Sequence, residues 1–359
     1  MFKLSFENLR RIHSIPLLAI SLLPLVLTAC AVDEEDTSAL RVRSIATVLG
    51  LTGDPTTDRV LPVISEPKAQ LGKKLFFTRG LSGDEDTACA SCHHPALAGG
   101  DGLSLSIGVG ADDINTVGPG RTHPSGGPTI PRNAPSTFNT GLRDRTLFLD
   151  GRVESIGKTV NLNGNDGAGI ITPDSTDNLT ADPDAGDNLP GAQARFPVTV
   201  TEFMRGFTNF AALTTNDEIR TAIETRLGSD PEWQAEFEDA YGDTTVTYAR
   251  IAEAIGEYER SQVFVNSPWK TFMEGDDNAI SDSAKRGALL FYGDLNPGLA
   301  CNQCHGGDFF TDERQTVTGF PQTGPGKGDG AAGDQDFGRA QQTGEIADRF
   351  MFRTPTLLN

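Results

Sequence analysis

Two stretches with the same spacing decide the fold of this chain: Cys89–His93, with the sequence CASCH, and Cys301–His305, with the sequence CNQCH. In each stretch two thiols stand three residues apart, and a histidine follows the second thiol directly. Thiols at this spacing can each add to a vinyl group of haem, and the histidine then lies under the iron as an axial ligand. We therefore predict two covalently bound c-type haems, with His93 and His305 as iron ligands.

The chain has five cysteines, and the two motifs use four of them, namely Cys89, Cys92, Cys301 and Cys304. If these four cysteines bind haem, none of them is available for a disulfide, although an exported protein could form one. A zinc site built from the two cysteine pairs is the main chemical alternative, but it does not explain why a histidine follows both pairs. A thioredoxin-like redox motif is disfavoured because no βαβ pattern surrounds either site.

The fifth cysteine, Cys30, ends an export signal. Residues 1–29 have a basic start, a short apolar run and small residues before a cleavage point. Residues 27–30, with the sequence LTAC, resemble a bacterial lipobox, so we predict lipidation of Cys30; an ordinary signal peptide with a stray cysteine is the alternative. We expect a periplasmic lipoprotein that is anchored to a membrane through its lipid alone. We predict that this membrane is the outer membrane. Residues 30–57 are rich in acidic residues, Ser and Thr and are predicted to form a flexible tether.

Similar segments precede the two motifs. Leu71–Phe76 and Arg286–Phe291 each carry a glycine and apolar residues at helical spacing. A helix, a short loop and the haem motif form the opening of a cytochrome c domain, so the repeat predicts two such domains in tandem. We predict an all-α fold with an N-terminal domain over residues 58–263 and a C-terminal domain over residues 264–359.

Further elements are predicted between the motifs. Amphipathic helices are expected at Asp217–Leu227, Pro231–Tyr241 and Thr247–Val263. Residues 99–127 and 161–193 are rich in Gly, Asp and Asn and are predicted to form long ordered loops.

The formal net charge of −19 excludes nucleic acid as a natural partner. Long-range attraction would be toward a basic partner. A solvated acidic surface that binds nothing is the alternative.

The order of motifs resembles that of the bacterial di-haem cytochrome c peroxidase and MauG family, from about residue 60 to the end. The matching stretches are residues 71–76, 81–83, 89–97, 131–136, 147–152 and 350–357. Residues 118–121 and 196–199 are similar to a branch with longer loops, which includes enzymes that oxidise tryptophan in a partner protein.

The resemblance implies different roles for the two haems. The haem on His93 would have an open face where peroxide binds, and the haem on His305 would receive and relay electrons. Some family members keep a removable histidine in the loop after the first motif, but Ser106–Gly110 has none. We therefore predict a first haem that is open without reductive activation, and a surface position for His123.

Three departures from the family pattern affect the expected chemistry. The family's tryptophan between the haems is Leu149 here, and leucine has no accessible oxidation state for electron hopping. The family's distal glutamate position is Phe203, so Glu202 is our catalytic candidate, with a solvent-facing residue at a helix start as the alternative. The family continues beyond Asn359 with a haem ligand and part of a calcium site, so we expect an incomplete second domain, with Asn133 as the remaining candidate calcium residue.

Three functions are open. The first is a peroxidase that reduces hydrogen peroxide with electrons from a small c-type cytochrome or cupredoxin. The second is a peroxide-dependent oxidation of side chains in a partner protein. The third is a di-haem electron carrier without catalysis. The family also implies a homodimer.

Overall fold

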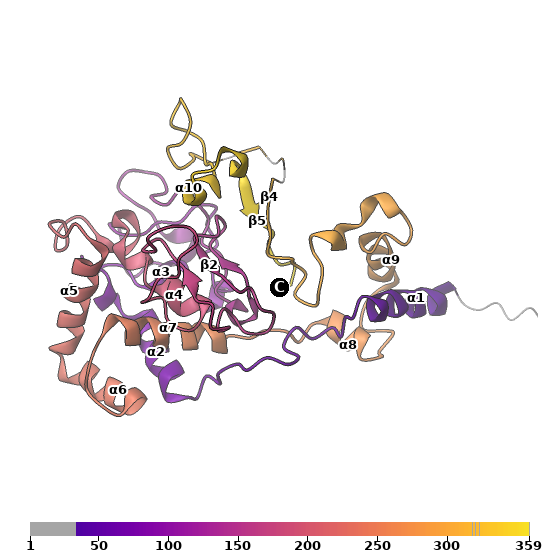
Figure 1. Cartoon of the computed structure of the whole chain (residues 1–359), viewed down its shortest axis with the longest axis horizontal. Coiled ribbons are helices and arrows are strands. Elements are labelled where there is room, and N and C mark those ends of the chain that lie inside the picture. Colours follow the sequence, from indigo (N-terminus) through magenta and orange to yellow (C-terminus); the bar gives the residue numbers. More distant parts are fainter. Residues whose placement is uncertain (1–33, 318, 320, 323, 359) are drawn as a thin grey trace, which may run out of the picture.

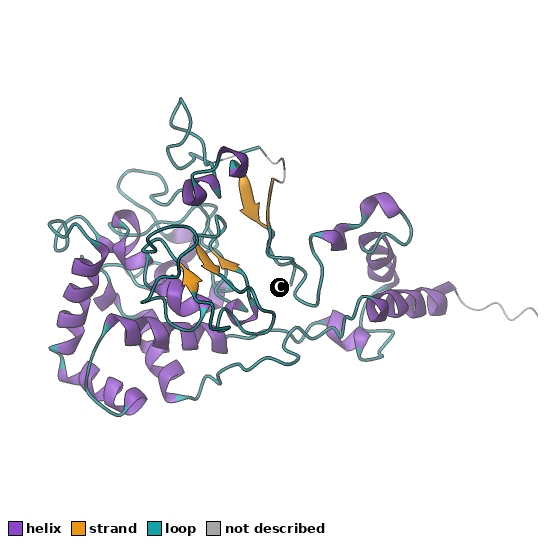
Figure 2. Cartoon of the chain, in the orientation of Figure 1, coloured by secondary structure: helices purple, strands orange, loops and turns teal. Residues whose placement is uncertain are grey.

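The computed structural model describes residues 34–317, 319, 321–322 and 324–358. Helices dominate the regular structure (Figure 2). Their bounds are α1 Glu34–Val48, α2 Pro67–Phe77, α3 Cys89–Cys92, α4 Leu189–Ala194, α5 Asn216–Gly228, α6 Pro231–Tyr241, α7 Tyr248–Ser261, α8 Pro268–Met273, α9 Asp282–Phe291 and α10 Ala340–Thr343.

Two small antiparallel sheets were missed by the all-α prediction. One has the order β1–β2–β3, with bounds Thr146–Leu147, Val153–Ser155 and Ile170–Ile171. The other pairs β4, Gln315–Val317, with β5, Met351–Arg353. Strands of two or three residues are too short to show an alternating pattern in the sequence. The prediction of a predominantly helical fold is confirmed, but the prediction did not include these two small sheets.

Helices α2 and α7 form the framework of the larger lobe, which also holds α3 to α6 (Figure 1). A Cβ at Gly72 would lie 1.8 Å from the carbonyl oxygen of Ala254, so the two backbones touch where the helices cross. One turn further on, the rings of Phe76 and Tyr258 meet edge to face with centroids 5.1 Å apart. The predicted helices at residues 71–76 and 247–263 are therefore confirmed, and their pairing is a finding of the structure.

Helices α5 and α6 cover the outer side of this pair. Thr215 caps α5 in a capping box with Glu218, and Asp230 caps α6 before its proline. Ile223, Leu227 and Phe237 are fully buried in the core beneath them. Both helices have the predicted bounds to within one residue.

The segment predicted as a long loop at residues 161–193 contains regular structure. Strand β3 lies within it, and α4 begins at Leu189 with its N-terminus capped by Asn188. Helix α4 packs on α7 where Gly191 meets Gly256 without side chains between them. A second core forms between α4 and the three-stranded sheet.

Part of the predicted flexible tether at residues 30–57 is a helix. Residues 34–48 form α1, which packs on α9 with Ala39, Val42 and Ala46 buried. These three residues are three and four positions apart and so share one helix face. Figure 1 shows α1, α8 and α9 together at one end of the molecule.

The C-terminal segment returns to the larger lobe. The backbone N–H of Arg353 donates to the carbonyl of Leu149 (2.8 Å). Leu358 is buried with Leu142 and Phe309 in a small core. The chain thus brings residues just before its end against the strands that follow residue 145.

The predicted export signal and Cys30 lie outside the described residues. Within the described part of the chain, no helix combines the length and the apolar character needed to cross a membrane.

We predict that Gly72→Ala destabilises the protein by about 1–3 kcal/mol or more, because the new methyl group meets the α7 backbone. Denaturant unfolding of the haem-loaded protein, followed by circular dichroism, measures this loss. The matched control is Gly287→Ala at the equivalent position of α9, where a Cβ has nothing within 4 Å. We expect the control to gain about 0.4–1 kcal/mol. Equal effects at the two sites would contradict the close crossing.

Candidate functional site

The first haem motif forms one short helix and opens into a large cavity. Cys89–Cys92 is α3, and the N–H of His93 donates to the carbonyl of Cys89 (2.9 Å). Both thiols are free, and both line a cavity of about 1100 Å³ together with His93. Burial raises the pKa of each thiol to about 12. Neither cysteine is therefore poised as a thiolate, which argues against thioredoxin-like chemistry.

The ring of His93 is held by backbone carbonyls. Its Nδ1 lies 3.0 Å from the carbonyl oxygen of Pro135 and 3.2 Å from that of Gly99. Because a carbonyl only accepts, Nδ1 must be the donor, and the lone pair is left on Nε2. Burial lowers the pKa of His93 and keeps the ring neutral. A neutral ring with a fixed Nδ1–H is the state in which histidine ligates a metal.

The walls of the cavity suit a flat apolar ring system. They include the side chains of Phe76, Leu81, Leu147, Phe148, Phe196, Val198, Met204 and Ile255. The volume is at the upper end of the range of about 300–1000 Å³ found for small-molecule sites. Two thiols, a neutral imidazole and apolar walls around one cavity fit a covalently bound haem at Cys89 and Cys92, ligated by His93.

The loop Ser106–Gly110, which contains no histidine, is held beside this cavity by hydrogen bonds. Arg121 donates to the carbonyls of Ile107 (2.9 Å) and Gly108 (2.7 Å). Ser106 lines the cavity, and its buried hydroxyl has no partner among the described residues. Ser106 is the residue of this loop that lines the cavity, and the open first haem stays a prediction.

Glu202 lies at the edge of the cavity. It is exposed, and it belongs to a π-helical turn at Thr201–Arg205. Its carbonyl accepts from Val109 (3.2 Å), which anchors the turn on the Ser106–Gly110 loop. Glu202 and Phe203 both line the cavity. Glu202 is thus a residue that both borders the cavity and is exposed to solvent, and its catalytic role stays a prediction.

Sequence reasoning missed a second carboxyl group, that of Glu259. It lines the same cavity from α7 and is buried, with its Oε2 unpartnered among the described residues. Burial raises the pKa of Glu259 from 4.5 to about 8. The signal was available, since Glu259 follows Ile251 and Ile255 at four-residue spacing and so occupies the apolar face of the helix.

The second motif has the same histidine geometry but a more open setting. Nδ1 of His305 lies 3.2 Å from the carbonyl oxygen of Phe310. Cys301 and Cys304 are exposed. The ring of Phe310 has an edge contact with Trp269, with centroids 6.2 Å apart. The donor set fits a covalently bound haem here too, with an aromatic wall on one side.

The other predicted residues have distinct positions. Leu149 lines the cavity. His123 bonds within its own loop to Ser125 (2.7 Å) and is half-buried rather than fully exposed. Asn133 lines the cavity and uses its amide to donate to the carbonyl of Leu103 (2.6 Å). Among the described residues no group of three or more His, Cys, Asp or Glu side chains could hold a metal ion, and the calcium role of Asn133 stays a prediction.

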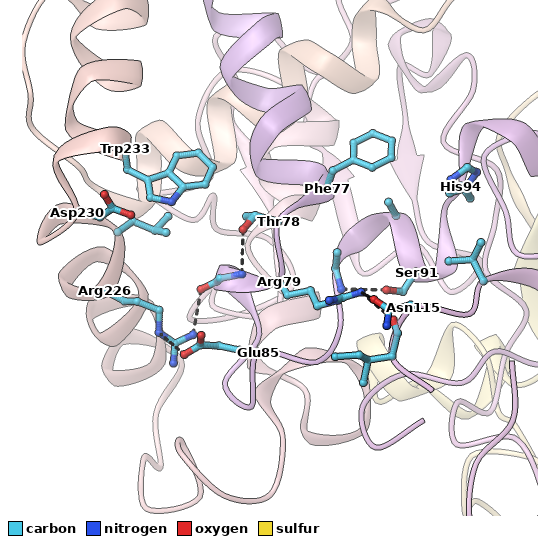
Figure 3. A pocket seen from close by; sticks show the side chains of 16 residues that line it. Phe77, Thr78, Arg79, Glu85, Ser91, His94, Asn115, Arg226, Asp230 and Trp233 are labelled. Carbon is cyan, nitrogen blue, oxygen red and sulfur yellow. Dashed lines mark hydrogen bonds and ion pairs between the residues drawn. The ribbon is translucent and has the colours of Figure 1, made fainter. Parts of the chain in front are cut away.

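A smaller pocket of about 650 Å³ lies on the outer side of the first motif (Figure 3). Its two arginines are occupied: Arg79 donates to the carbonyl of Ile114, and Arg226 donates to the carbonyls of Gly80 and Ser82. The pocket offers no attachment thiol. It therefore does not compete with the large cavity as the haem site.

Comparisons with known proteins agree with this site. A family profile described as "Di-haem cytochrome c peroxidase" matches residues 66–278, which include the first motif. The chain is 31% identical over 253 residues to the cytochrome-c peroxidase IdrP2 of Pseudomonas sp. (strain SCT), covering 70% of this chain and 51% of that protein. It is 27% identical over 296 residues to the methylamine utilization protein MauG of Methylorubrum extorquens, covering 82% and 62%. The chain thus spans between half and two thirds of the length of these relatives.

Solved structures share the fold. A MauG-like protein associated with microbial copper homeostasis superimposes with a TM-score of 0.56 at 22% identity, covering 84% of this chain and 73% of that one. The di-haem peroxidase BthA from Burkholderia thailandensis superimposes with a TM-score of 0.56 at 20% identity, covering 85% and 68%.

We predict that Glu259→Gln changes the pH dependence of stability. Between pH 4.5 and about 8 the unfolded protein ionises Glu259 while the folded protein keeps it protonated. The folded state binds the extra proton, so the stability of the wild type falls as pH rises through this window. Glutamine does not titrate. The stability of the variant relative to the wild type should therefore be roughly 3–5 kcal/mol greater at about pH 8 than at about pH 4.5.

Denaturant unfolding at the two pH values measures the effect. The control is Glu238→Gln on the exposed face of α6, which should change stability equally at both. Parallel stability curves for wild type and Glu259→Gln would contradict a protonated, buried Glu259.

Proposed function

The chain belongs to the di-haem cytochrome c peroxidase family, and we propose that it reduces hydrogen peroxide to water with electrons from a small c-type cytochrome or cupredoxin. The observation that carries the proposal is the large cavity in which His93, both thiols of its motif and two carboxyl groups meet. The balanced reaction takes up two electrons and two protons for each peroxide and releases two waters.

Haem c bound at Cys89 and Cys92 would supply the redox-active iron on which peroxide is reduced. His93 would hold the iron from one side, oriented by the carbonyls of Pro135 and Gly99. The Ser106–Gly110 loop, which contributes Ser106 to the cavity wall, contains no histidine that would ligate the iron. Apolar walls limit water, which strengthens each remaining polar interaction in the cavity.

Glu202 is the proposed proton carrier. It borders both the cavity and solvent, so its carboxylate can take a proton from water and deliver it to an oxygen atom inside. Glu259 is buried and stays protonated at neutral pH. It could donate a proton, but its burial keeps it from regaining one from solvent as readily as Glu202. The position of Glu202 supports its role by geometry, which comes before pKa in such assignments.

The cavity and its surroundings favour peroxide reduction over the alternatives. An electron carrier would need the same cavity for its haem, so the carboxyl-bearing residues on the cavity wall, Glu202 and Glu259, are what favour catalysis. Oxidation of a partner protein's side chains requires rapid charge sharing between haems, and Leu149 on the cavity wall cannot be oxidised for this purpose. A net charge of −19 suits a basic electron donor.

We also propose export to the periplasm and lipidation at Cys30, from the sequence at residues 27–30. Growth with radiolabelled palmitate tests this. The wild-type chain should carry label, and a labelled Cys30→Ser variant would overturn the assignment.

We predict that Glu202→Gln lowers kcat for peroxide by roughly 10²–10⁴-fold, because general acid catalysis is lost while the cavity keeps its shape. A steady-state assay with reduced c-type cytochrome and the haem-loaded protein measures it. Glu238→Gln is the control and should keep wild-type kcat. A Glu202→Gln variant within twofold of wild type would remove Glu202 from the mechanism, and a haem-loaded wild type without turnover would refute the proposed function.

A further inference from the structure

Two buried arginines differ from the other buried arginines of the described chain. Arg195 and Arg220 have aspartate partners, Asp182 and Asp174. Arg121 is occupied by backbone carbonyls. Arg143 has no aspartate partner, and its Nη1 has no acceptor among the described residues. Arg353 has no aspartate partner and makes only long hydrogen bonds to carbonyls.

Arg143 follows the short turn Thr140–Leu142 and is 9% exposed. Its Nη1 is fully buried and has no hydrogen-bond partner among the described residues. It packs over the ring of Phe309, with the guanidinium carbon 5.2 Å from the ring centroid. A buried guanidinium without an acceptor is costly unless something else supplies one.

Arg353 ends β5 and is 5% exposed. It makes two long hydrogen bonds, to the carbonyls of Phe148 (3.3 Å) and Thr354 (3.4 Å), which leave Nη2 without a partner among the described residues. Burial, and next the nearby charge of Arg143, lower the pKa of Arg353 to about 9. The two arginines are therefore close enough to repel each other.

One carboxylate near them, Glu313, does not neutralise both. Its oxygens already accept the backbone N–H groups of Asp144 (2.9 Å) and Arg145 (3.2 Å). Two guanidinium groups and one carboxylate leave one net positive charge buried at the cavity, because Arg143 and Arg353 both line it.

We propose that Arg143 and Arg353 together bind a carboxylate, and that this carboxylate is a propionate of the haem attached at Cys89 and Cys92. Guanidinium forks are the usual partners of buried carboxylates. The cavity is shared with His93 and both thiols of the first motif, which favours that haem as the source. A propionate bound by both guanidinium groups would link Arg143, in the larger lobe, to Arg353, near the end of the described chain.

The same chemistry could come from the haem attached at Cys301 and Cys304, since Phe309 closely follows that motif and packs on Arg143. The experiment below separates the two sources. The inference rests on the haem loading of the proposed function but not on peroxide turnover, so a protein without peroxidase activity can still pass or fail it.

The test is an optical redox titration of each haem in the haem-loaded full chain, between about pH 5 and pH 8, for wild type, Arg143→Gln and Arg353→Gln. Loss of a guanidinium should shift the redox equilibrium of the first haem about tenfold toward the ferric form, or about 59 mV for one electron. The midpoint potential should also become pH-dependent, because the propionate now takes up a proton in this range. A merely structural role would not produce that pH dependence.

Arg145→Gln is the matched control, two residues along the chain and outside the cavity lining. It should leave both potentials and their pH profiles unchanged. In a Cys301→Ala/Cys304→Ala background, persistence of the effect on the first haem supports the proposed source. An effect that follows the second haem instead overturns that source while retaining the carboxylate site.

Unchanged potentials and pH profiles for both haems in Arg143→Gln and Arg353→Gln would overturn the proposal. If Arg143→Gln does not load haem, Arg143→Lys replaces it. Lysine keeps the charge but not the fork, so Arg143→Lys should retain a potential close to that of the wild type, and the result for Arg353→Gln then supports or overturns the site.

Discussion

The candidate site depends on the crossing of α2 and α7, where Gly72 lets the two helix backbones touch. This contact places Phe76, from α2, and Glu259, from α7, on the same side of one cavity. Any side chain at residue 72 would separate the helices and widen the wall that they form. Helix α4 then closes on α7 through a second contact between glycines, Gly191 and Gly256. Close packing at two points makes this part of the cavity stiff.

On this framework, backbone atoms do most of the positioning. Carbonyl groups orient His93, and Arg121 donates hydrogen bonds to two carbonyl groups of the Ser106–Gly110 loop. The turn that carries Glu202 is anchored on the same loop through Val109. The histidine is thus held by one set of hydrogen bonds, and the loop and the candidate proton carrier are held by another. Such a set fixes geometry without adding reactive side chains to the cavity.

The cavity also contains groups that reduce stability in the absence of a partner. Glu259 is a buried carboxyl without full hydrogen bonding, and Arg143 and Arg353 leave a positive charge in an apolar setting. Departures of this kind from an apolar core are expected where function, rather than folding, selects the residue. Here they lie on the same cavity as the haem motif. The proposed carboxylate site would account for the arginines, and the proton balance of Glu259 remains a property of the protein itself.

The amino-acid sequence by itself determined the chemistry of attachment, because Cys89, Cys92 and His93 are neighbours in the chain and their spacing alone matches haem. It also determined most helices, since apolar periodicity and caps are local signals. It could not place α1, where buried alanines on one face mattered more than the surrounding charge. Only the tertiary structure decided that Glu259 and Glu202 share a cavity and that Arg143 meets Arg353. These groups lie far apart in sequence, and the helix crossing and the return of the C-terminal segment bring them together, so no local pattern could report them.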